Sequence, residues 1–457
     1  MKEYIKLING WLLVATAAAI LVVHQLISSG MFFDGLTYAS VSENMGNSFW
    51  SLHYTETFRN DFYEHPPLAF WLQSIFMSCG IEENLYSLCM LMLAGWLMAR
   101  IFRITGGDKE LAWFPTLLFV CTPIVFWSFG NNMLENTLTV FVLLTTYIQM
   151  VILNKNLPTI WSIIPGLLLV ACFLVKGPVG LFPLVILPLH WYFLNEKLDY
   201  KKYINHFLFC GLGIIIFSIF LFLNDNSRIF LSNYFNQQVL ASIAGEREVS
   251  SFRFSILIKL FLEILIMAGF TLILYFIQKK SIKKNQFLFF VSIGLCASLP
   301  ILISAKQLGF YIVPSLAFFA LGFSFLVNKK WMEYLSSWVI FILLVATFFV
   351  SSFFVIKSSI GATRDKPQFE LVNFFGEKYY HFKTISVSKR IMEDWVLHAY
   401  LYRYCTISLD DKNKHEYLIL SSDERIPGDY QLEFKTQVYN ICTKNKIRKE
   451  KIIFFPQ

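Results

Sequence analysis

Charged side chains are scarce in this sequence. Only 15% of its 457 residues are Asp, Glu, Lys or Arg, and 56% are hydrophobic, whereas an average soluble domain has about 25% charged residues. So much apolar surface cannot be hidden inside one soluble core, which excludes a soluble protein. The aromatic share of 18%, with 48 Phe and 11 Trp, suits side chains that face lipid tails or lie at the membrane–water interface.

Cysteines with the spacing of a metal site are also lacking. Six of the eight fall in apolar stretches, where they are small core residues: Cys79, Cys89, Cys121, Cys172, Cys210 and Cys296. Cys405 and Cys442 lie in the polar C-terminal segment, where a disulfide can form if that segment faces an oxidising compartment. A signal-peptide cleavage site is lacking too, because the N-terminal apolar run continues to Ile27, so we expect an uncleaved first span.

Long basic tracts are missing, although the net charge is +8. The Lys and Arg residues stand in short clusters between apolar runs, where they act as membrane topology signals. We therefore expect membrane lipids as neighbours and no nucleic-acid partner.

Apolar runs dominate what is present. Eleven are long enough to cross the roughly 30 Å hydrocarbon core of a bilayer, at about 8–28, 84–102, 111–128, 133–153, 159–175, 177–194, 205–223, 255–277, 286–304, 309–327 and 332–356. A twelfth stretch, 68–79, has the shorter length of a re-entrant or interfacial segment. The predicted fold is mainly α, a polytopic bundle of about eleven membrane spans.

Basic loops decide whether the short stretch crosses the membrane, because cytoplasmic loops carry the excess of Lys and Arg. With eleven crossings and a cytoplasmic N-terminus, every basic loop lies on the cytoplasmic side: Arg100, Arg103 and Lys109; Lys155; Lys197, Lys201 and Lys202; Lys279, Lys280, Lys283 and Lys284; Lys329 and Lys330. This topology places the loops 29–83 and 224–254 on the outer face, together with the tail 357–457.

The tail differs from the rest of the chain, because its apolar residues form short runs among charged and polar ones. We predict a membrane domain at 1–356 and a small extracytoplasmic α/β domain at 357–457. The role of this domain stays open, and a binding module for an assembly partner is one alternative.

The first outer loop is rich in ionisable groups. Asp34 follows the first span and precedes an amphipathic stretch that can lie along the membrane interface. Glu64 and His65 precede the short apolar helix. The predicted topology brings further polar residues to the same membrane depth: Asn131, Asn132, Glu135, Lys176, Lys306, Gln307 and Tyr311. Two carboxylates and two lysines in one cavity can offer a base to a hydroxyl nucleophile and cations to a phosphate leaving group.

Six short motifs, in this order, carry a family resemblance. They are DGLTYA from Asp34, EHPPL from Glu64, ENTLT from Glu135, KGP from Lys176, and SAK from Ser304 followed by YIVP from Tyr311. This pattern resembles the protein mannosyltransferase and aminoarabinose transferase superfamily of C-type glycosyltransferases (GT-C). The resemblance implies an enzyme of a bacterial inner membrane that moves a sugar from a polyprenyl-phosphate carrier to a lipid, glycan or protein acceptor, with inversion.

The resemblance also suggests roles for single residues. Asp34 is the candidate base or acceptor-orienting carboxylate, and Glu135 stands where the family usually has Asp. His65 stands where the aminoarabinose branch has Lys and the protein-mannosyl branch has His, which argues against copying the lipid A function. Candidates for the donor phosphate are Lys176, Lys306, Tyr311 and Arg247, with Arg253 and Arg228 as rivals. Candidates for sugar or acceptor contacts are Tyr38, Glu64 and His65, and the last two are candidate ligands of a divalent metal ion.

Each assignment has a structural alternative. Asp34 and Glu135 can serve as helix caps, Lys176 can be an anchor at a helix end, and Glu64 can make an ordinary loop hydrogen bond. A transporter or flippase of lipid-linked sugars is the alternative function. Against it, the candidate residues gather at one outer boundary and not at the midplane, and the spans show no matching halves.

Overall fold

The computed structural model describes residues 2–45, 49–53, 61–195, 200–244, 254–278, 283–304, 306–327, 335, 337–361, 363–378 and 383–445. Arg247 and Arg253 lie outside these residues. The chain divides into two compact units, one made of 1–52 and 62–362 and the other of 53–61 and 363–457.

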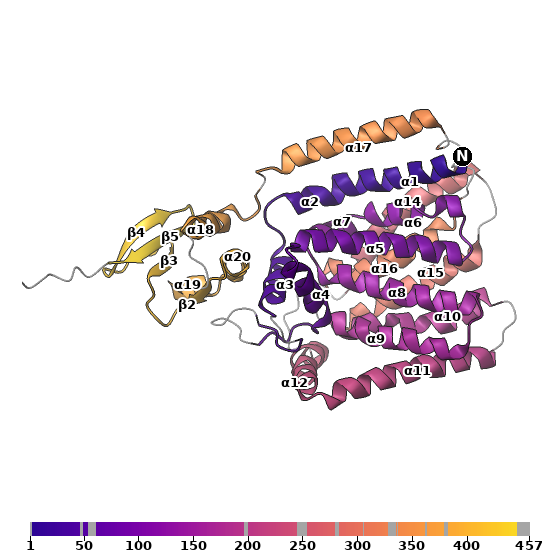
Figure 1. The fold of residues 1–457 in the computed structure, drawn as a ribbon, viewed down its shortest axis with the longest axis horizontal. Coiled ribbons are helices and arrows are strands. Elements are labelled where there is room, and N and C mark those ends of the chain that lie inside the picture. Colours follow the sequence, from indigo (N-terminus) through magenta and orange to yellow (C-terminus); the bar gives the residue numbers. More distant parts are fainter. Residues whose placement is uncertain are drawn as a thin grey trace, which may run out of the picture. The chain divides into compact units, whose positions relative to one another are not determined.

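The first unit is helical throughout its described part. Its long helices lie side by side, and α17 runs along α1 (Figure 1). Its helices are α1 (Lys2–Ala18), η1 (Ala19–Val23), α2 (His24–Ile27), α3 (Phe33–Asn44), α4 (Leu68–Ser78), α5 (Glu83–Ile104), η2 (Lys109–Leu111), α6 (Phe114–Val120), α7 (Pro123–Gly130), α8 (Leu134–Asn154), η3 (Thr159–Ser162), α9 (Ile163–Lys176), η4 (Gly177–Val185), α10 (Ile186–Leu194), α11 (Tyr200–Leu223), α12 (Asp225–Tyr234), η5 (Phe235–Leu240), α13 (Ala241–Ala244), α14 (Ser255–Gln278), α15 (Lys284–Ser298), η6 (Leu299–Ile303), η7 (Gly309–Ile312), α16 (Val313–Ser324) and α17 (Trp338–Ser359).

Eight helical segments of the described residues are long and apolar enough to cross a membrane, or nine if a bent pair counts as one span. The bent pair joins Lys109–Val120 to Pro123–Gly130 at 77°. The bend arises because Pro123 disfavours a helical conformation at Thr122, which is extended. A multi-span membrane bundle is therefore confirmed, and the 11-residue α4 is too short to cross.

The stretch Thr159–Leu194 counts as one segment of 36 residues, yet two antiparallel helices make it up. A straight helix of that length would extend about 54 Å, far beyond the bilayer core. A Cβ on Gly180 would lie 2.4 Å from the Cys172 carbonyl oxygen, and Leu169 packs in one cluster with Leu187. The chain therefore reverses near Gly177. With the bent pair counted as the ninth span, this reversal and the shorter apolar helix Gly309–Ser324 account for the remaining two of the eleven predicted spans.

Gly177 is needed at the reversal, because its φ of +74° suits glycine and an added Cβ would lie 1.9 Å from the Tyr234 hydroxyl. We expect Gly177→Ala to lower the free energy of unfolding by roughly 1–3 kcal/mol, seen as a lower thermal midpoint in detergent. Gly211→Ala is the control, because open space surrounds that position in α11. Equal midpoints for the two variants would show that the reversal tolerates a side chain.

The second unit is a small α/β domain, as predicted for the tail. Its five-stranded sheet has the order β2-β1-β3-β5-β4, with β1 parallel to both of its neighbours and β5 antiparallel to both of its own. The elements are α18 (Lys366–Glu377), β1 (Thr384–Val387), α19 (Lys389–Met392), α20 (Trp395–Cys405), β2 (Ser408–Asp410), β3 (Tyr417–Ser421), β4 (Tyr430–Lys435) and β5 (Tyr439–Lys444).

The two cysteines of this unit are both buried and are not joined to each other. The Cys405 thiol donates a hydrogen bond to the Val372 carbonyl oxygen, whereas Cys442 packs in an apolar cluster with Leu418 and Leu420. The disulfide considered from their position in the sequence is therefore not formed, because each thiol belongs to the core.

Candidate active site

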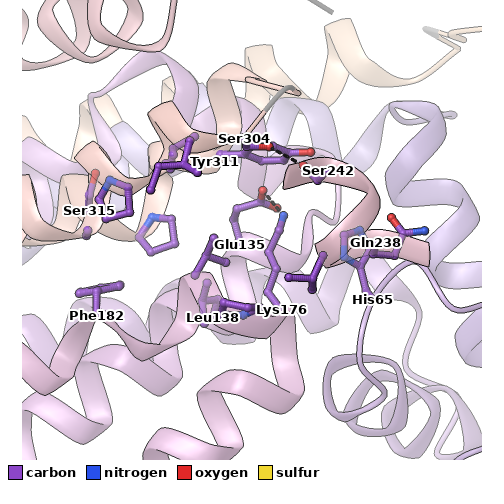
Figure 2. A pocket seen from close by; sticks show the side chains of 18 of the residues that line it. His65, Glu135, Leu138, Lys176, Phe182, Gln238, Ser242, Ser304, Tyr311 and Ser315 are labelled. Atoms are coloured by element: carbon purple, nitrogen blue, oxygen red, sulfur yellow. Dashed lines mark hydrogen bonds and ion pairs between the residues drawn. The ribbon is translucent and has the colours of Figure 1, made fainter. Parts of the chain in front are cut away.

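A cavity of about 350 Å³ lies in the first unit, among α8, the α9–η4 reversal, the η5–α13 segment and the η6–η7 region (Figure 2). Polar side chains that line it are Glu64, His65, Glu135, Lys176, Gln238, Ser242, Ser304, Tyr311 and Ser315, and apolar ones include Leu138, Val179, Phe182, Ile301 and Ile303. Figure 2 shows His65 and Gln238 on one side of Lys176, and Leu138 and Phe182 on the other. The cavity therefore offers one polar and one apolar part.

A buried ion pair stands in the middle of the lining. Glu135 lies in the first turn of α8, Lys176 is the last residue of α9, and the Lys176 ammonium donates to Glu135 Oε1. Glu135 is fully buried and Lys176 is 8% exposed. The second carboxylate oxygen, Oε2, has no hydrogen-bond partner among the residues described. Glu135 is thus more than a helix cap, because its charge compensates that of a lysine from another helix.

Aromatic rings hold the same lysine from the other side. The Lys176 Nζ atom lies 4.7 Å from the centroid of the Tyr311 ring and 5.6 Å from that of Phe310. Cation–π attraction is strongest at such desolvated positions. Lys176 is therefore buried and fixed, whereas a lysine anchor at a helix end reaches out to the membrane interface.

Asp34 lies in the first turn of α3, after the first span, and makes no side-chain cap. Burial raises the pKa of Asp34 to about 6, while Lys306 and Lys176 oppose this rise and Glu135 and Glu64 add to it. The four other ionisable groups predicted to share this depth thus lie close enough to influence the Asp34 carboxyl. Asp34 itself is not among the residues that line the cavity.

Tyr38 lies four residues after Asp34, which places both side chains on one face of α3. The Tyr38 hydroxyl is 3.2 Å from His65 Nε2. Burial, strengthened by Asp34, raises the pKa of Tyr38 well above its ordinary value, so its hydroxyl stays neutral. The stretch after Asp34 was predicted to be amphipathic and able to lie along the membrane interface. Its apolar residues Tyr38, Val41 and Met45 are all buried inside the unit.

The part of the site that the structure describes offers few metal ligands. No group of three or more His, Cys, Asp or Glu side chains in the described ranges could hold a metal ion. Of the described residues, Glu64 and His65 line the cavity as two adjacent candidate ligands, fewer than the three or four side chains of a usual protein zinc site.

Lys306 lies between η6 and η7 and, like Asp34, is not among the residues that line the cavity. Of the two lysines that oppose the rise in the pKa of Asp34, it has the larger influence. Its loop is held by hydrogen bonds from the Gln307 amide to the Leu302 and Ser304 carbonyl oxygens, both 3.3 Å long. Arg228, a predicted rival for the phosphate, is exposed on α12, is paired with Asp225, and does not line the cavity.

Sequence reasoning missed part of the lining. Gln238 and Ser242 come from the outer loop 224–254, which the sequence marks only as a long polar segment, and the Ser242 hydroxyl is 3.3 Å from that of Ser304. The sequence does not distinguish Leu138 and Phe182 as cavity-lining residues, because Leu and Phe are common in every span.

The fold and this cavity define a polytopic membrane protein with a buried carboxylate–lysine cluster beside an apolar groove. Residues 64–223 match the family model of dolichyl-phosphate-mannose-protein mannosyltransferase. ArnT from Cupriavidus metallidurans bound to undecaprenyl phosphate has the same fold, with a TM-score of 0.70 at 14% identity over 95% of this chain and 98% of that one. Its apo form gives a TM-score of 0.64 at 15% identity, over 95% and 97%. No curated protein matches the sequence.

The chain accordingly has the fold of ArnT, and its residues 64–223 resemble the protein mannosyltransferase family.

Proposed function

We propose that this protein is a membrane glycosyltransferase that takes a sugar from a polyprenyl-phosphate donor and passes it to an acceptor, with inversion at the anomeric carbon. The observation that carries the proposal is the cavity in which an apolar lining meets the Glu135–Lys176 pair, with Asp34 and Lys306 nearby. A lipid-linked phosphate has the same two parts. The structure of ArnT with undecaprenyl phosphate supports this choice of donor.

In the proposed reaction the prenyl chain lies along Leu138 and Phe182, and its phosphate lies between Lys176 and Lys306. An acceptor hydroxyl attacks C1 of the sugar from the face opposite the phosphate, its proton passes to Asp34, and the C1–O bond breaks. The electron pair of that bond leaves on the phosphate, where the two lysines stabilise the added charge. Tyr38 and His65 form hydrogen bonds to a hydroxyl of the sugar or of the acceptor.

The acceptor can be a lipid, a glycan or a protein, and the charge pattern of the loops favours a site on the extracytoplasmic face of a bacterial inner membrane, with the tail domain on that same face. We expect residues 1–356 to suffice for donor binding, because every candidate residue lies there.

The test is transfer by the purified protein in lipid nanodiscs, with radiolabelled sugars on polyprenyl phosphates as donors and a membrane extract from the source cell as acceptor. A labelled product formed only with the donor and active protein supports a transferase. Sugar donors that cross the bilayer of proteoliposomes without forming product would favour a transporter instead.

The pH dependence of transfer gives a second expectation. Because burial raises the pKa of Asp34 to about 6, its carboxylate is protonated below that pH and cannot accept a proton. The rate should therefore stay level above about pH 7 and fall about tenfold per unit below pH 6. A rate profile at saturating donor, with protein integrity followed at each pH, checks this. A profile that is flat down to pH 5 would remove Asp34 as the base.

A further inference from the structure

The turn between α7 and α8 holds both candidate carboxylates in place. It contains Asn131 and Asn132, each 4% exposed, and it leads directly into the first turn of α8, where Glu135 lies. Asn132 has a φ of +50°, a left-handed conformation that Asn tolerates better than most residues.

The two amide side chains bind the backbone on either side of Asp34. The Phe32 backbone N–H donates to Asn131 Oδ1 over 2.6 Å, and the Asn132 Nδ2 atom donates to the Gly35 carbonyl oxygen over 3.1 Å. Hydrogen bonds thus hold the start of α3 at Phe32, two residues before Asp34, and at Gly35, one residue after it.

The backbone of α3 also packs directly against the backbone of this turn. A Cβ on Gly35 would lie 1.9 Å from the Asn131 carbonyl oxygen, so only glycine lets α3 approach the turn this closely. Asn132 is fixed in turn by Gln73 of α4, whose Nε2 donates to Asn132 Oδ1 over 2.9 Å. The Gln73 Oε1 atom lies 2.9 Å from the Ser42 hydroxyl of α3.

We infer that Asn131 and Asn132 are positioning residues that set the placement of Asp34 relative to Glu135, and that Asn132 is the more specific of the two. The Asn132 amide joins three elements, α3, α4 and the start of α8, through one side chain. This inference rests on the proposed function, because a base must be held close to the attacking hydroxyl. A displacement of about 1 Å can reduce a rate by about 10²-fold.

Asn132→Gly tests the inference, because glycine accepts the left-handed backbone and removes only the amide. Asn156→Gly is the matched control, since Asn156 has a φ of +54° and is exposed at the other end of α8. We expect kcat of the Asn132 variant to fall about 10- to 100-fold with a donor KM within about threefold of wild type, and the control to match wild type. Because a smaller active fraction alone also lowers the apparent kcat at an unchanged KM, each rate is divided by the concentration of folded protein, measured by size-exclusion chromatography. A corrected kcat equal to that of wild type would show that the variant is merely destabilised.

A second readout does not need turnover. Labelling of Asp34 by a hydrophobic carbodiimide, followed against pH by mass spectrometry, reports its apparent pKa. Loosening the first turn of α3 admits water, so in Asn132→Gly we expect this pKa to fall toward the ordinary value of about 3.9, with no change in Asn156→Gly.

The outcomes separate the two proposals. Wild-type kcat and an unchanged Asp34 labelling profile in Asn132→Gly would overturn the positioning role while leaving the transferase intact. The opposite result is that wild type transfers no sugar while the Asp34 labelling profile still shifts in Asn132→Gly. It would overturn the proposed function and keep the structural link between the turn and Asp34. Asn132→Asp, which keeps the size and the acceptor oxygen but loses the donor to Gly35, replaces the glycine variant if that one fails to fold.

Discussion

Replacing Asp34 with Asn is expected to lower the transfer rate by about 10²- to 10⁴-fold, the usual contribution of a positioned general base. The variant should fold normally. Asn has the same shape, the Asp34 side chain makes no cap on α3, and a neutral amide removes a charge whose burial is unfavourable.

The measurement is single-turnover transfer of radiolabelled sugar by detergent-purified wild type and variant, with enzyme in excess over the labelled donor. Asp108→Asn is the matched control, because Asp108 is an exposed carboxylate of the same unit, 3.9 Å from Lys283. Turnover of Asp34→Asn within a few-fold of wild type, with the control also active, would exclude Asp34 from the chemistry and move attention to Glu64.

Much of the fold follows from the sequence, because a membrane span is a local property. A run of apolar residues long enough to cross the bilayer can be recognised from its own sequence, without knowledge of the helices that pack against it. The same holds for a run that is too short to cross, such as α4. The sheet of the tail was predictable for the same reason, since its strands are short apolar runs between polar turns. The count of separate helices was less certain, because the reversal at Gly177 and the bend at Pro123 divide or join runs of similar composition.

The candidate site was only partly predictable. Membrane depth brought Asp34, Glu135, Lys176 and Lys306 together, since each lies at the end of a span or beside one. Depth says nothing of which partner each side chain meets. The Glu135–Lys176 pair joins residues 41 positions apart, and the hydrogen bonds of Asn132 to α3 and α4 depend on how three elements pack. These contacts are set by the tertiary arrangement, which no local pattern encodes.

The largest effect on stability is expected at the Glu135–Lys176 pair. Lys176→Met leaves the fully buried carboxylate of Glu135 without its counter-charge, and Glu135→Gln leaves Lys176 alone. Breaking a buried pair from one side costs roughly 3–5 kcal/mol, whereas removing both charges is often nearly neutral. We expect each single variant to lower the thermal midpoint strongly and the double variant to recover most of the loss.

Transfer activity separates the two roles of this pair. If Lys176 holds the donor phosphate, the double variant is stable yet inactive, because removal of both charges restores the fold but not the cation that meets the leaving group. Thermal unfolding and transfer of all four proteins form a double-mutant cycle. A double variant no more stable than the less stable single variant would show that the charges of Glu135 and Lys176 do not stabilise each other. A stable double variant that still transfers sugar would assign the phosphate to Lys306, and the buried pair would then serve the fold alone.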